Sequence, residues 1–113
     1  MPPRFLDEPA FKCLRAGDLA GFLQVTENRT TVDFSGADLR GVDFRNVDLH
    51  KLLLRDAYLR DADLRGCDLR HMDLSGTSIQ GARVSGAYFP HDVDAREIQL
   101  SLQFGTRIRT RPA

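Results

Sequence analysis

A five-residue repeat runs without a break from residue 32 to residue 91, and it constrains the fold more than any other feature of the chain. The central residue of every unit is large and apolar, and a second, usually smaller residue of the kind that proteins bury stands two positions before it. A short period repeated this often indicates a stacked repeat architecture. The central residues are Phe34, Leu39, Phe44, Leu49, Leu54, Leu59, Leu64, Leu69, Leu74, Ile79, Val84 and Phe89.

The period of five matches neither the helical period of about 3.6 nor the strand period of about 2. Within one unit the two apolar positions are two residues apart, so an extended backbone directs both to the same side. Because five is odd, the chain must turn once per unit to keep that side facing inward. The pattern predicts an all-β solenoid, in which short extended segments meet at regular corners and stack through backbone hydrogen bonds. Turn-forming residues occupy the fifth position at Gly36, Gly41, Asn46, Asp56, Asp61, Gly66, Gly76, Gly81 and Gly86.

The letters of the units point to a known family. ADLRG occurs at Ala37–Gly41 and again at Ala62–Gly66, and VDF or VDL variants begin at Val32, Val42 and Val47. These units resemble the pentapeptide-repeat family, whose motif is A-(D/N)-L-x-x. The resemblance implies a right-handed quadrilateral β-helix with four units per coil, hence about three coils, and it implies a bacterial origin, since the family is mostly bacterial.

The N-terminal flank carries helix signals where a repeat array needs a cap. We expect residues 1–31 to form an N-terminal helical cap, with two short helices within residues 7–25. Asp7 is a candidate N-cap of the first helix, and Gly17 is a natural end for it. Asp18 is then placed to cap the second helix.

The C-terminal flank, residues 92–113, is expected to form a capping helix and a basic tail. Asp94 and Glu97 have capping-box spacing, which predicts that the helix begins there. The residues expected to lie against the last coil are Ile98, Leu102 and Phe104. We expect the tail to fray. The alternative that its arginines bind an anionic partner stays open; the arginines are Arg107, Arg109 and Arg111.

The charge balance argues against a nucleic-acid partner, because 16 basic residues face 16 acidic ones and the net charge is zero. Residues twenty apart would stack, so columns of Asp and Arg on the outer walls are expected to neutralise one another. The chain shows no apolar run long enough for a membrane helix and no secretory signal, which favours a cytoplasmic protein. Cys13 and Cys67 read as small core residues, and no cofactor or small-molecule substrate is evident.

Three units depart from the charged outer pattern, with Leu53, Tyr58 and Tyr88 at the position where Asp is common. Exposed apolar clusters tend to mark interfaces, so these residues are candidate contacts for a partner or a second subunit. The alternative is that a cap or a neighbouring side chain covers them. His71 and His91 are also twenty apart and would stack, either as the start of a metal site or as a pair of surface histidines.

These observations favour a non-enzymatic protein-interaction or structural module of the pentapeptide-repeat type, which binds a protein partner or associates with itself. Two alternatives stay open. The resemblance implies a DNA-mimicking protein that binds a topoisomerase, DNA gyrase, although members with that role are longer and strongly acidic. The second alternative is a metal-binding protein. No phosphate loop or nucleophile–base arrangement in the sequence points to an enzyme.

Overall fold

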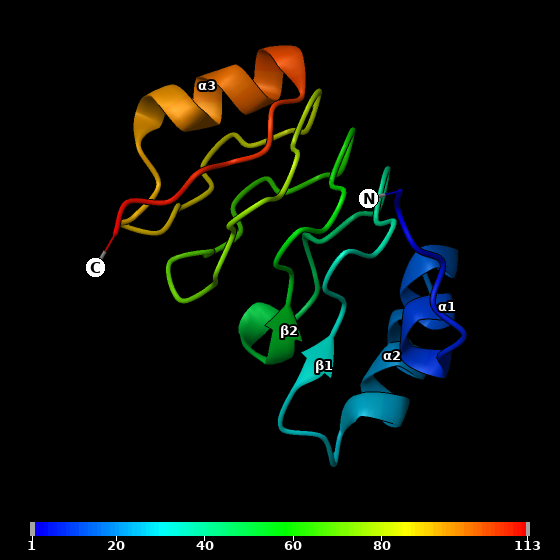
Figure 1. Cartoon of the computed structure of the whole chain (residues 1–113). Helices are drawn as coiled ribbons and strands as arrows, with labels where there is room; N and C mark the ends of the chain where they lie inside the picture. The colour runs from blue at the N-terminus through cyan, green and yellow to red at the C-terminus, as the bar shows by residue number, and fades with distance from the viewer. Residues whose placement is uncertain (1, 113) are drawn as a thin grey trace.

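A computed structural model of the chain describes residues 2–112 and shows the repeat region between helices at its two ends (Figure 1). In Figure 1, helices α1 and α2 lie at one end of the repeat region, and α3 lies across the other. In chain order the elements are α1 (Pro9–Ala16), α2 (Leu19–Thr26), β1 (Val32–Asp33), the 3₁₀ helix η1 (Leu49–Lys51), β2 (Leu52–Leu53) and α3 (Ala95–Phe104).

Parallel bridges between residues twenty apart hold the repeat region together. β1 pairs in parallel with β2, and isolated bridges of the same spacing join Asp43 to Asp63 and Asp63 to Arg83. Backbone hydrogen bonds accompany the bridges, as where the Phe44 N–H donates to the Asp63 carbonyl over 2.9 Å. Four units therefore make one turn of the stack. We call residues 32–51, 52–71 and 72–91 the first, second and third layers.

The central residues of the units form the core, as the repeat predicts. The first ten of them are at most 7% exposed, and most are within 1% of complete burial. Val84 and Phe89, the last two, are only partly buried and pack against the core from the end of the third layer. Burial therefore decreases toward the side of the stack where the repeat stops.

The corners lie at the fifth position of the units, where eight of the nine expected turn residues have positive φ. Asp56 and Asp61 adopt this left-handed conformation with φ of 62° and 59°, which aspartate tolerates better than most residues. Gly76 follows Asp56 by one layer, and a Cβ at Gly76 would lie 1.9 Å from the Asp56 Oδ1. That corner therefore requires glycine for space as well as for φ.

Regular strand is scarcer than the repeat predicted. Within residues 2–112, β1 and β2 have two residues each, whereas α1, α2 and α3 have 8, 8 and 10. The expected helices are therefore present at both ends, but the stack between them contains much less regular strand than an all-β solenoid implies. The physical reason is that each unit offers only two or three extended residues before its corner, so most neighbouring layers meet through single bridges. No helix in this part of the chain is long and apolar enough to cross a membrane.

Helix α1 begins one residue later than its expected cap. Its N-cap is Glu8, and Asp7 instead forms an ion pair with Lys12, with Oδ1 and Nζ 2.8 Å apart. Pro9 fills the first helical turn, where a missing N–H leaves nothing unsatisfied, so the helix starts without a side-chain cap. Asp18 caps α2 as predicted, because its carboxylate accepts the Gly21 N–H.

The first layer is covered by α1, α2 and the segment before them. The rings of Phe11 and Phe34 meet edge to face with centroids 5.8 Å apart, and Phe22 contacts the same Phe34 ring at 6.5 Å. Arg4 extends the stack by one residue, because its carbonyl accepts the Asp38 N–H over 2.8 Å. These contacts leave Asp38, an outer-position residue, only 1% exposed.

Helix α3 begins as predicted, with the Asp94 carboxylate accepting the Arg96 N–H. The second half of the expected capping box is wrong, because the Glu97 carboxylate accepts the backbone N–H of Arg109 over 2.9 Å and also pairs with its guanidinium. Gly105 ends the helix with φ of 74°. The domain limits 1–31, 32–91 and 92–113 stay a prediction.

The C-terminal tail closes part of the third layer instead of fraying, so that expectation is wrong. Ile108 is 2% exposed, and its N–H donates to the Thr77 carbonyl over 2.8 Å. From α3, the Ser101 hydroxyl accepts the buried Ile79 N–H over 3.0 Å. Ile98 and Leu102 are partly buried against the core, but Phe104, which we expected there, is 62% exposed.

Candidate interaction site

Four units of the stack, within residues 37–46 and 62–71, carry an aspartate–arginine pair on their outer side. Asp63 illustrates the arrangement: its Oδ1 accepts the Arg65 backbone N–H, and its two oxygens accept from Nε and Nη2 over 2.9 and 2.7 Å. The Arg65 guanidinium lowers the pKa of Asp63 to about 2. The same two-point clamp joins Asp38 to Arg40, Asp43 to Arg45 and Asp68 to Arg70.

These clamps confirm that the charges of the wall cancel locally. Each carboxylate also completes a turn, since it accepts the N–H two residues ahead in the way that Asx turns do. Aspartate at the second position of a unit therefore accepts hydrogen bonds from the backbone and from the arginine side chain, and replacing it removes both interactions.

The unit at residues 52–56 lacks this clamp. Leu53 stands in the aspartate position and is 44% exposed, although the residues opposite it in the layers below and above are Asp33 and Asp73. Arg55 consequently has no carboxylate two residues before it. Among the described residues its ion-pair partner is Asp73, whose Oδ2 lies 3.9 Å from Nη1, too far for a hydrogen bond. One substitution thus exposes an apolar side chain and releases a guanidinium.

A cavity of about 260 Å³ lies beside Leu53, between the first and third layers. Arg55 and Asp73 line it, and His50 and His71 lie at the same cavity with ring centroids 6.1 Å apart. Its apolar lining is made by Leu49, Leu52, Leu53, Leu54 and Met72. The site therefore combines an apolar surface with polar groups from all three layers.

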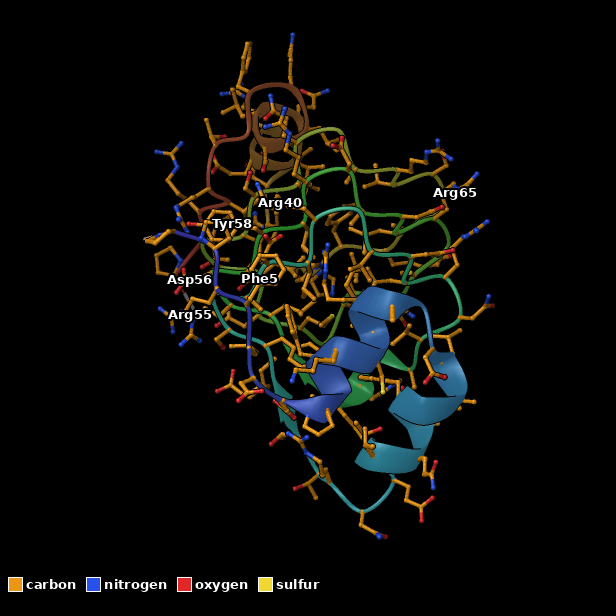
Figure 2. The ribbon with its side chains drawn as sticks, turned by 90° about the vertical axis from the view of Figure 1, so that its right-hand side faces the viewer. Phe5, Arg40, Arg55, Asp56, Tyr58 and Arg65 are labelled. Atoms are coloured by element: carbon orange, nitrogen blue, oxygen red, sulfur yellow. The ribbon has the colours of Figure 1, made fainter. Side chains whose placement is uncertain are left out.

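Tyr58 lies away from this cavity, under the C-terminal tail. The Arg107 guanidinium stands over its ring at 5.0 Å from the centroid, and Arg107 Nη2 donates to the Tyr58 hydroxyl. Figure 2 shows Tyr58 on the same side of the stack as Arg55 and Asp56, with Arg65 on the opposite side. Of the two sequence interpretations, cover by a neighbouring side chain describes Tyr58, while its role as a contact stays a prediction.

Tyr88 lies apart from both Leu53 and Tyr58. It is 57% exposed, it bridges to Asp68 in the layer below, and the Arg70 guanidinium lies 4.9 Å from its ring centroid. Leu53, Tyr58 and Tyr88 therefore stand on three different walls and do not form one patch.

The histidine pair differs from the predicted one. The structure brings His50 to His71, while the stacking of His71 with His91 stays a prediction, and the Nδ1 of His50 lies 3.0 Å from the Asp48 carboxylate. Within residues 2–112, no group of three or more His, Cys, Asp or Glu side chains is arranged to hold a metal ion. His91 instead contributes its carbonyl to the Arg111 side chain.

Sequence reasoning did not identify Arg55 as a site residue. The sequence did carry a signal for it. An arginine with an aspartate two residues before it is clamped, whereas the residue two before Arg55 is Leu53.

Comparison with known proteins agrees with the repeat pattern. The family described as pentapeptide repeats matches in eight copies over residues 30–52 and 53–89, which together are more than half of the chain. A search among curated proteins finds no match. On the repeat, the twenty-residue register and this match, the chain belongs to the pentapeptide-repeat family.

Proposed function

We propose that the protein is a non-enzymatic interaction module whose contact site is the Leu53 cavity. Pentapeptide-repeat proteins are generally non-enzymatic structural or interaction modules. The proposal includes the finer architecture of the family, a right-handed quadrilateral β-helix of about three coils, which the bridges between residues twenty apart support. It also includes a cytoplasmic location, which the two free cysteines favour.

The observation that carries the proposal is the lapse at Leu53. A wall of clamped aspartate–arginine pairs offers little to a partner, because each charge is already matched and surface ion pairs contribute little. The wall that carries Leu53 has no such pair, because Asp33 and Asp73 accept from Ser35 and Ser75, and at Leu53 it presents exposed apolar surface beside a cavity. Apolar surface at the centre of a polar rim is the usual composition of a protein interface.

The same clamps weigh against the DNA-mimicking alternative, which needs a wall of unmatched acidic charge. With 16 acidic and 16 basic residues, the gyrase-binding hypothesis rests on the family resemblance alone.

Affinity capture with quantitative mass spectrometry tests the proposal, together with light scattering for self-association. Leu53→Asp is compared with wild type and with Leu23→Asp, a matched control because Leu23 is 58% exposed on α2. We expect Leu53→Asp alone to lose a specific partner or the dimer. Identical partners and identical mass for all three proteins contradict the proposal.

A further inference from the structure

We propose that the Leu53 cavity binds a peptide segment that carries a large apolar side chain next to a carboxylate. This inference rests on the proposed function and adds the chemistry of the partner. It follows from which groups around the cavity already have their hydrogen bonds and which do not.

The size of the cavity favours a single side chain. At about 260 Å³ it is smaller than the roughly 300–1,000 Å³ of pockets that enclose whole small molecules. The residues that line it near Leu53 are Leu52, Leu54 and Met72, an apolar lining that suits an aliphatic or aromatic side chain. A segment of a protein that inserts one such residue fits this space.

The carboxylates at the cavity are already engaged. Asp68 holds both Nε and Nη2 of Arg70 at 2.9 Å, and the Oδ1 of Asp73 accepts the Ser75 N–H at 2.9 Å. The hydrogen bond from Ser75 lowers the pKa of Asp73, so this carboxyl is ionised at neutral pH. Neither carboxylate needs a cation from a partner.

The guanidinium of Arg55 is a charged group at the cavity with donors to offer. Among the described residues it meets no acceptor within hydrogen-bond distance, and Asp73 at 3.9 Å only balances part of its charge. Arginine binds carboxylates by two parallel hydrogen bonds, as Arg65 and Arg70 do on other walls of the stack. A partner carboxylate supplies to Arg55 what Asp provides to its neighbours, and the Leu53 surface takes the adjacent apolar side chain.

The test is selection of a random twelve-residue peptide display library on the full-length protein, followed by titration of the enriched peptides. We expect enriched sequences to pair a large apolar residue with Asp or Glu. Changing that acidic residue to its amide, or Arg55→Gln in the protein, leaves at most one of the two hydrogen bonds and removes the charge, so binding is expected to weaken at least about ten-fold. Arg60→Gln is the matched control, because Arg60 also lacks an aspartate two residues before it but lies outside the cavity.

The variant Asp73→Asn tests whether the cavity recognises a negative or a positive charge on the peptide. Asparagine keeps an oxygen for the Ser75 N–H but removes the competing charge beside Arg55, so binding of an acidic peptide is expected to tighten several-fold. Peptides that bind in a Leu53-dependent manner but weaken with Asp73→Asn, or ignore Arg55→Gln, overturn the acidic partner while leaving the proposed function standing. Enriched peptides that bind wild type and Leu53→Asp equally overturn both.

Discussion

Adjacent residues Leu53 and Leu54 differ sharply in exposure, and the stack predicts that they differ as sharply in their contribution to stability. Leu54 is 1% exposed in the second layer, in register between Phe34 and Leu74, whereas Leu53 is 44% exposed. Leu54→Ala removes three carbon groups, which at about 0.8 kcal/mol per buried CH₂ is about 2.4 kcal/mol of transfer free energy. Backbone hydrogen bonds to both neighbouring layers restrict collapse around the void, so the total is expected near 3 kcal/mol, in the lower half of the range for such cavities.

Urea unfolding followed by far-ultraviolet circular dichroism measures the free energy of unfolding of both variants. Leu53→Ala is expected to lower it by less than about 1 kcal/mol, because half-exposed side chains lose little on truncation. With a total stability of about 5–15 kcal/mol for a domain, a difference of about 2 kcal/mol between the variants is readily resolved. Equal losses in Leu53→Ala and Leu54→Ala would refute the assignment of inward and outward positions.

Three further measurements address the end of the stack and its walls. Ile108→Ala is expected to destabilise by about 2–4 kcal/mol in urea unfolding, since Ile108 is buried, whereas Arg109→Gln at the exposed side of the tail should cost less than about 1 kcal/mol; similar small losses would mean that the tail does not close the third layer. Ser101→Ala leaves the Ile79 N–H without its acceptor and should cost about 1–3 kcal/mol in thermal unfolding, while an unchanged midpoint would show that water replaces the hydroxyl. The folded-state pKa of Asp63, about 2, is below its ordinary value of 3.8, so the stability that Asp63 contributes is present above the ordinary value and is lost as pH falls toward 2. Asp63→Asn, which keeps an acceptor for the Arg65 N–H, should therefore flatten the fall in the urea midpoint between about pH 5 and pH 2, and an undiminished fall would contradict this.

The parts of the fold that the sequence predicted are those with local causes. The period of five places a corner in every unit, and Asp56 and Asp61 adopt positive φ at two of those corners as their turn chemistry suggests. Gly17 and Gly105 end helices, and Asp18 and Asp94 begin them, because capping depends on neighbours within a few residues.

The parts that the sequence did not predict depend on contacts between distant residues. Ile108 has no local pattern that marks it as buried, since its partner Thr77 is 31 residues away. Tyr58 is covered by Arg107, which is 49 residues away, and the Leu53 cavity combines side chains from separate layers. To identify Arg55, one must also know that the arginines of other units are paired with their own aspartates.

Photo-crosslinking from position 53 tests most directly the claim that the lapse in the charged wall is the contact site. A benzophenone amino acid replaces Leu53 in one variant and Leu23 in another, since both side chains are exposed but only Leu53 borders the cavity. On irradiation in cells that naturally produce the protein, we expect a discrete adduct from position 53 that disappears when Arg55→Gln is added, and none of the same mass from position 23. The same adducts from both positions, or none from position 53, would contradict the account.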